Sequence, residues 1–138
     1  MKKNIILLSS TFLPDMGGVQ VGLHNIALNL IKNNYNPIIL IPYSFKKKLK
    51  KNNFKLPYKI IFLPPKILTL NKYFPTLSFL FLSIFFYFLK IKYSVYYWHI
   101  TVVYPLGVAF IYFAKIFSYN NYLIRAVGED IQIHQKIR

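Results

Sequence analysis

The chain begins with a short apolar run, a glycine-containing loop and an amphipathic segment, an order that is typical of a strand–loop–helix unit. Residues Asn4–Ser9 are rich in Ile and Leu, the pattern of a strand that is buried on both faces. The next segment, Ser10–Gly18, contains Pro, Asp and a Gly-Gly pair and therefore predicts a turn. From Val19 to Ile31 the apolar residues are spaced by three and four, which predicts a helix with one stripe packed on a sheet.

The same alternation continues along the chain and predicts four more strands. Short apolar runs bounded by turn residues occur at Pro37–Pro42, Tyr58–Leu63, Tyr93–Ile100 and Tyr122–Val127. Longer apolar segments with helical character lie at Tyr73–Leu89 and Pro105–Phe117. Strands that alternate with helices favour a Rossmann-like α/β fold, with a mostly parallel sheet, helices on both faces and right-handed crossovers. A length of 138 residues predicts one domain, residues 1–138.

The glycine pair Gly17 and Gly18 stands directly before the first predicted helix, and two interpretations remain open for it. Glycine backbone allows close approach of a ligand, and the free N–H groups of a helix N-terminus favour a phosphate. Alternatively, the pair makes a tight turn that packs the helix against the strand. The loop matches neither the Gly-Lys-Ser/Thr phosphate loop nor the G-x-G-x-x-G dinucleotide pattern.

The loop and helix together resemble a known family. The segment Phe12–Val19, followed by a helix with His24, Asn25 and Leu28, is similar to the start of the N-terminal domain of family-4 glycosyltransferases with the GT-B fold. In that family the loop faces the interdomain cleft. The resemblance implies that the backbone of the Gly-Gly pair approaches the diphosphate of a nucleotide-sugar donor.

Two later segments carry the same resemblance. Ser94–His99 is similar to the family's Asp-Val-Val-His-x-His, with His99 on the second His and without the acidic residue and the first His. Gly128–Gln132 is similar to Thr-x-His-Gly-x-Asp-Ile, but Val127 replaces the His before the Gly. The resemblance therefore assigns no catalytic residue.

Five charged or titratable side chains are candidates for the acceptor side of such a site: Asp15, His99, Arg125, Glu129 and Asp130. His99 lies at the carboxyl end of a predicted strand, where open parallel sheets bind ligands. A packed, hydrogen-bonded histidine is the alternative. Arg125 either binds an anion or forms a salt bridge with one of the two carboxylates that follow it.

The charge balance indicates an anionic partner. Eighteen Lys and Arg residues oppose three Asp and Glu residues, which gives a net charge of +15. Six lysines lie in Phe45–Lys55, either as a solvated loop or short helix or as a patch for anionic lipid head groups. Aromatic residues do not alternate with these lysines, so nucleic acid is not an expected partner. There is an alternative explanation for part of this positive charge. An AT-rich genome favours codons for Lys, Asn, Ile, Phe and Tyr, so codon bias alone would raise the number of lysines.

Few residues are available for metal or paired-carboxylate chemistry. With three acidic residues and no cysteine, we expect no metal site and no cofactor, and the absence of cysteine fits a reducing compartment. The nucleotide-sugar would act as a substrate.

The segment Tyr73–Leu89 is apolar on every face, with Lys72 and Lys90 at its ends, and Pro75 is the expected start of its helix. A helix of the soluble core, an interfacial helix in one leaflet and a membrane span are all compatible with this pattern. We favour a helix of the fold whose outer face contacts the membrane, and we expect a cytoplasmic protein that is peripheral at the inner face of the membrane.

The resemblance covers only the N-terminal half of a GT-B enzyme. It implies an acceptor-side domain that, with a C-terminal donor-binding domain, moves a sugar from a nucleotide-sugar to a glycan or lipid-linked acceptor. We expect that second half in the same gene or in a second chain, so that this chain is a fragment or one half of a split enzyme and is inactive alone. The alternatives are a non-catalytic membrane-docking subunit that recruits a catalytic partner and, less favoured, a small integral membrane protein.

Overall fold

A computed structural model of the chain describes residues 2–53 and 55–126. Five parallel strands form one sheet in the order β3-β2-β1-β4-β5. The strands are β1 Asn4–Leu8, β2 Asn36–Ile41, β3 Lys59–Phe62, β4 Val95–Ile100 and β5 Tyr122–Ile124. The helices are α1 Gly18–Lys32, α2 Phe45–Lys51, α3 Ile67–Tyr73, α4 Pro75–Lys92 and α5 Leu106–Ile116.

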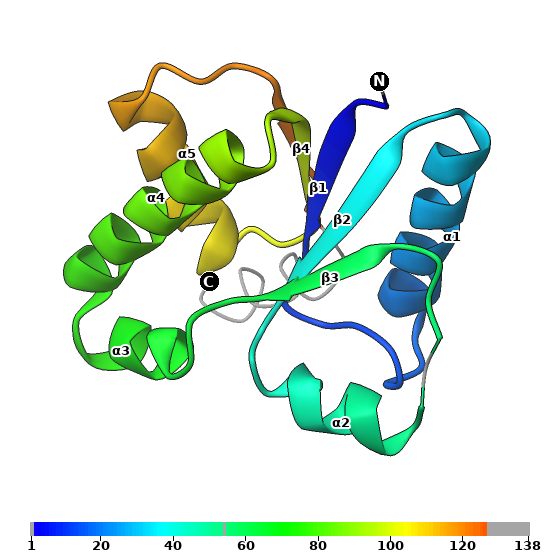
Figure 1. The fold of residues 1–138 in the computed structure, drawn as a ribbon. Helices are drawn as coiled ribbons and strands as arrows, with labels where there is room; N and C mark the ends of the chain where they lie inside the picture. Colours follow the sequence, from blue (N-terminus) through cyan, green and yellow to red (C-terminus); the bar gives the residue numbers. More distant parts are fainter. Residues whose placement is uncertain (1, 54, 127–138) are drawn as a thin grey trace.

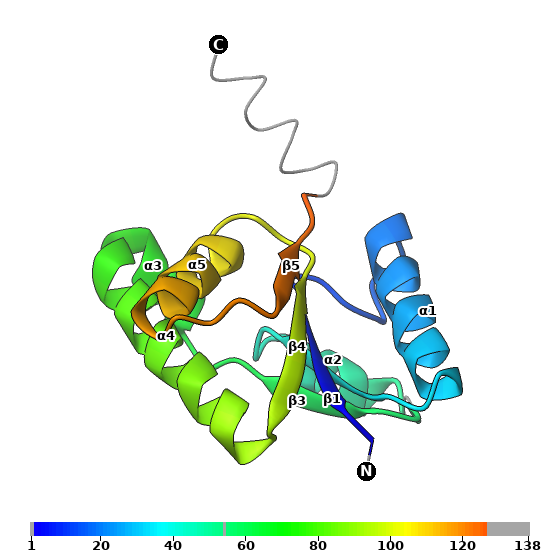
Figure 2. The same cartoon turned by 90° about the horizontal axis from the view of Figure 1, so that it is seen from above.

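Helices cover both faces of this sheet, so the predicted Rossmann-like α/β fold is confirmed (Figures 1 and 2). In β1, Ile5 and Leu7 point into a core shared with α1 and α2. Their neighbours Ile6 and Leu8 point into the second core, under α3, α4 and α5. A strand buried on both faces explains why the sequence of β1 is continuously apolar instead of alternating.

The strand order explains which helix lies on which face. From β1 to β3 the chain moves outward in one direction, and from β3 it returns past β1 to β4 and β5. Crossovers of one hand place their helices on opposite faces when the direction of travel reverses. The helices α1 and α2 accordingly share one face, and α3, α4 and α5 share the other (Figure 2).

An aromatic cluster fills the core beneath α4 and α5. Trp98 of β4 lies with its ring centroid 5.5 Å from that of Phe86 and 5.0 Å from that of Phe110. Phe113 contacts all three rings. These four side chains are fully buried, and aromatic side chains of this size dominate the free energy gained by burial.

The helix α4 begins at Pro75, as the sequence predicts, and continues three residues beyond the predicted end at Leu89. Its inner face is buried in the fold by Ser78, Phe79, Leu82, Ser83, Phe86 and Leu89. The buried serine hydroxyls donate to the carbonyl oxygens of Ile67 (3.4 Å) and Phe79 (2.8 Å), so neither is left without a partner. Among the described residues, α4 is the one helix that is long and apolar enough to cross a membrane, and here it packs as an outer-layer helix of the fold.

Candidate functional site

The site lies where β1 and β4 are neighbours. From β1 the chain crosses over one face of the sheet to β2, and from β4 it crosses over the other face to β5. The two connections diverge from the carboxyl ends of adjacent strands, which opens a crevice between them. In open α/β sheets ligands bind at this topological switch point.

A cavity of about 350 Å³ occupies the α1 side of this edge. Its wall on α1 is formed by Gly18, Val19, Gly22, Leu23 and Ile26. The opposite wall, after β4 and β5, is formed by Thr101, Arg125 and Ala126. We call this the switch-point cavity. It brings together two of the candidate residues, which lie far apart in the sequence: Gly18 is the first residue of α1, and Arg125 directly follows β5.

The α1 wall exposes bare backbone. A β-carbon added at Gly18 or at Gly22 would meet no atom within 4 Å, so both glycines face open space. They lie one helical turn apart and therefore share one face of α1. Gly17 precedes the helix in an extended conformation that any residue can adopt, and an added β-carbon there would meet only the flexible side chain of Gln20. The absent side chains at Gly18 and Gly22 thus leave room for a ligand against the helix.

The N-terminus of α1 can donate hydrogen bonds to an anion. The first intrahelical bond runs from the N–H of Val21 to the carbonyl of Gly17, so the N–H groups before Val21 have no partner within the helix. Gly17 offers no side-chain cap. Free amides and the positive end of the helix dipole favour a phosphate or a carboxylate at this position.

The opposite wall is held in place by the strand ends. Both the N–H and the hydroxyl of Thr101 donate to the carbonyl of Leu8, at 2.9 and 3.2 Å. The N–H of Arg125 donates to the carbonyl of Ile100 at 2.8 Å, which fixes the start of the side chain beside the cavity. No carboxylate within residues 2–53 and 55–126 pairs with the exposed Arg125 guanidinium. Arg125 therefore supplies a positive charge to a wall whose other lining residues, Thr101 and Ala126, are uncharged.

His99 lies on the same face of the sheet as α1. It pairs in register with Leu7 and with Leu123, and Leu7 belongs to the core beneath α1. Burial, and secondarily the charge of Arg125, lowers the pKa of His99 below its usual value. Its Nε2 is buried and has no hydrogen-bond partner in the described part of the chain. His99 is not among the residues that line the switch-point cavity.

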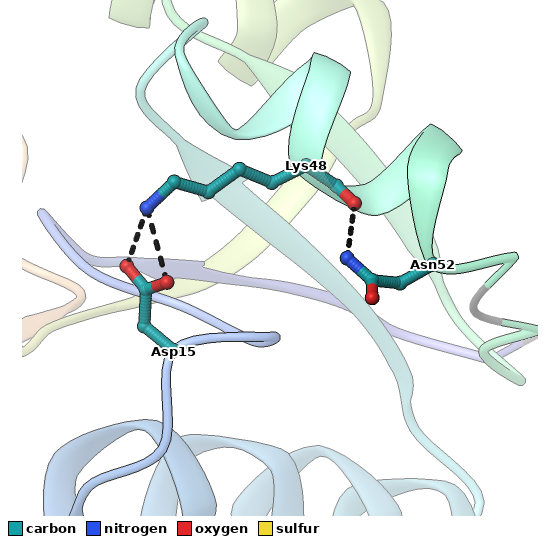
Figure 3. A network of polar contacts seen from close by, with 3 residues as sticks. All are labelled: Asp15, Lys48 and Asn52. Carbon is teal, nitrogen blue, oxygen red and sulfur yellow. Dashed lines mark hydrogen bonds and ion pairs between the residues drawn. The ribbon is translucent and has the colours of Figure 1, made fainter.

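Asp15 is engaged in an ion pair at the side of the site. Lys48 Nζ lies 2.7 Å from Asp15 Oδ2 and 3.0 Å from Oδ1 (Figure 3). Asn52 Nδ2 in turn donates to the carbonyl of Lys48 at 2.8 Å. This contact fastens the loop after β1 to α2 and leaves Asp15 outside the cavity lining. Of the predicted lysine segment Phe45–Lys55, the part Phe45–Lys51 is a short helix, and its Lys48 forms an ion pair with the carboxylate of the loop.

Three other residues of the resemblance, Gly128, Glu129 and Asp130, lie outside the described residues. His24, which also belongs to the resemblance, serves the fold instead. Its Nδ1 lies 2.6 Å from the Tyr58 hydroxyl, which ties α1 to the segment before β3. Burial raises the pKa of Tyr58 to about 12.

The sequence reasoning named Gly18 and Arg125 as site candidates but none of the other residues that line the cavity, among them Gly22 and Thr101. Gly22 could have been found, since its spacing of four from Gly18 places both on one helix face. Thr101 carries no such signal, because its place beside β1 follows from the strand order. Within the part of the chain that the structure describes, no three His, Cys, Asp or Glu side chains gather as metal ligands.

No family model, curated protein or solved structure matches this chain. Its function is therefore inferred from the geometry of the site and from the sequence motifs.

Proposed function

We propose that this chain is the N-terminal, acceptor-side domain of a glycosyltransferase. The observation that carries the proposal is the switch-point cavity, which joins the N-terminus of α1, the bare backbone of Gly18 and Gly22, and the guanidinium of Arg125. Amides and a guanidinium around a mostly apolar hollow suit a ligand that has an anionic part and a neutral part. A nucleotide-sugar donor has this character.

In the proposed reaction the chain supplies binding and orientation. The α1 amides and Arg125 would hold the diphosphate of the donor, and they would stabilise the negative charge that develops on it as the sugar departs. A hydroxyl of a glycan or a lipid-linked acceptor would attack the sugar, with Asp15, His99, Glu129 and Asp130 proposed on the acceptor side. Holding both substrates in line accounts for a large part of such catalysis. The second wall of the cleft would come from a C-terminal donor-binding domain, in the same gene product or in a partner chain, so we expect no transfer by this chain alone.

The test is a binding titration of the purified chain with uridine and guanosine diphosphates and with inorganic pyrophosphate, followed by NMR or calorimetry. Two variants address the two walls: Gly22→Leu fills the cavity, and Arg125→Gln removes the charge. Val21→Leu, on an exposed part of α1, and Lys50→Gln, an exposed lysine of α2, are the matched controls. Loss of a charged hydrogen bond of about 1.5–3 kcal/mol predicts about 10- to 150-fold weaker binding for Arg125→Gln. Equal binding by Gly22→Leu, Arg125→Gln and their controls would refute the proposed site.

A second candidate function is a non-catalytic subunit that docks a catalytic partner at the membrane. The outer face of α4 favours it, because large apolar side chains are exposed there at helical spacing: Leu77, Leu80, Phe81, Ile84, Phe88 and Ile91. Exposed apolar patches of this kind mark interaction surfaces. In either function we propose that this face contacts the inner, cytoplasmic surface of a membrane. A docking subunit would bind vesicles but no nucleoside diphosphate, which distinguishes the two candidates.

A further inference from the structure

A second pocket lies on the opposite face of the sheet from the switch-point cavity. It has a volume of about 470 Å³ and is formed where the junction of α3 and α4 meets the loop between β4 and α5. Its lining residues are Leu68, Asn71, Lys72, Pro75, Tyr104 and Pro105. We call it the α3–α4 pocket. Because α3 follows β3 and Tyr104 follows β4, the pocket opens at the carboxyl edge of the sheet.

Asn71 gives this pocket an unused hydrogen-bond donor. Its side-chain Oδ1 accepts a hydrogen bond from the Tyr104 hydroxyl at 3.2 Å. Its Nδ2 is buried and donates to no atom of the described residues, while the residue as a whole is only 5% exposed. Buried polar groups in folded proteins are almost always hydrogen-bonded. Asn71 lines the pocket, so a small rotation of its side chain would turn this unused donor toward a ligand that brings the acceptor.

Two neighbouring features indicate that this acceptor is anionic. Lys72, the next residue, is exposed and also lines the pocket, and its ammonium lies 5.8 Å from the centre of the neighbouring Tyr73 ring. Pro75, another lining residue, is the first residue of the 18-residue helix α4, and Phe74, which precedes it, provides no side-chain cap. The first bond of the helix runs from the N–H of Ser78 to the carbonyl of Phe74, so the amides of Thr76 and Leu77 have no partner within the helix and add to the positive potential. An amide donor, an ammonium and a helix N-terminus together suit a phosphate group.

The surface around the pocket indicates where such a phosphate would come from. Tyr73 and Phe74 at the α3–α4 junction are 67% and 62% exposed, and the exposed apolar stripe of α4 starts beside them at Leu77. Lys90 and Lys92 mark the far end of that stripe. The one carboxylate side chain within residues 2–53 and 55–126, that of Asp15, is bound to α2, which packs on the other face of the sheet. The apolar stripe is thus bordered by positive charge alone among the described residues, which complements an anionic lipid surface.

We propose that the α3–α4 pocket binds the phosphate head group of an anionic membrane phospholipid while the outer face of α4 rests among the acyl chains. This inference rests on the proposed membrane contact and is independent of sugar transfer. It assigns different partners to the two cavities of the carboxyl edge: a soluble nucleotide-sugar on the α1 side and a lipid on the α4 side.

The experiment is sedimentation of the chain with vesicles of phosphatidylcholine alone and with vesicles that also contain phosphatidylglycerol. Lys72→Gln removes the ammonium at the pocket, and Lys47→Gln, on the exposed side of α2, is the matched control of equal charge. Asn71→Leu removes the amide donor, with its folding checked by circular dichroism. We expect binding to the anionic vesicles, weakened about fivefold or more by Lys72→Gln and by Asn71→Leu and less than about twofold by Lys47→Gln.

Each other outcome overturns the proposal in a different way. An equal loss for Lys72→Gln and Lys47→Gln would mean that general surface charge, and no head-group pocket, binds the vesicles; this comparison holds even if Asn71→Leu does not fold. Saturable binding of soluble glycerol 3-phosphate to the wild-type chain, without binding to vesicles, would assign the pocket to a free phosphate compound. Absence of all vesicle binding would remove the membrane contact, whereas the nucleotide titration would still test the switch-point cavity separately.

Discussion

Gly107 of α5 lies so close to Val102 that a β-carbon added to the glycine would come within 2.4 Å of the Val102 carbonyl oxygen. The contact is between backbones, so no side chain can rotate away to make room. It sets the position of α5 against the chain leaving β4, and thereby the position of the loop that contains Tyr104.

The first prediction follows from this contact. Gly107→Ala should lower the free energy of unfolding by about 1–3 kcal/mol, the usual cost of overpacking, although alanine is the better helix former. Gly22→Ala is the matched control, because a β-carbon there meets open space. It should raise the free energy of unfolding by up to about 1 kcal/mol. Urea denaturation of the two variants measures both values, and equal effects would contradict the close packing of α5 on Val102.

Alkaline pH should destabilise the fold. Burial raises the pKa of Tyr58 to about 12, and burial followed by the charge of Tyr97 raises that of Tyr119 to about 12, from the usual 10.0. The folded state therefore holds these protons more tightly than the unfolded state. The resulting stability is complete below pH 10 and is lost as the pH rises from 10 to 12. Thermal melts across this range measure the loss, and Tyr58→Phe should reduce its slope. A slope unchanged in this variant would contradict the assignment.

Acid should also destabilise the fold, through His99. Its pKa is lowered by burial and by Arg125, so the folded state binds the proton less readily than the unfolded state. The contribution to stability is present above pH 6.5 and is lost as the pH falls through the folded-state pKa. NMR titration of the imidazole should show a neutral ring at about pH 7. In Arg125→Gln the titration should move toward higher pH, because one of the two causes is removed.

The ion pair between Asp15 and Lys48 should contribute little to stability. Both side chains are nearly half exposed, and exposed pairs contribute about 0–1 kcal/mol. Asp15→Asn should therefore change the free energy of unfolding by less than about 1 kcal/mol, and the difference should shrink further in high salt. A larger loss, measured by denaturation at low and high salt, would show that the pair orders the loop between β1 and α1 more strongly than its exposure implies.

The elements with a strong apolar pattern could be predicted from the sequence. All five strands and the helices α1, α4 and α5 occur where the pattern places them, with ends that agree to within three residues. The helix α3 was missed, because its seven residues are too few to establish a periodicity and Lys66, which precedes it, has a left-handed conformation instead of a capping side chain.

The site was predicted less completely than the fold. Gly18 and Arg125 were recognised as candidates, but only the order of the strands places them at one cavity. Thr101 and the α3–α4 pocket depend on contacts between segments far apart in the chain. The sequence does not state which strands are neighbours in the sheet. Residues that meet at a site only because their strands are neighbours therefore cannot be recognised from the sequence pattern of each segment.

The position of β1 has a consequence for the order of synthesis. One edge of β1 pairs with β2, which follows within a few tens of residues, but the other edge pairs with β4, which begins only at Val95. Until residues 95–100 leave the ribosome, the central strand of the growing chain keeps a row of unpaired N–H and C=O groups beside an uncovered apolar surface. Such edges promote association with other chains. The nascent protein is therefore most exposed to aggregation during the translation of α4, a segment that adds large apolar side chains of its own to the uncovered surface.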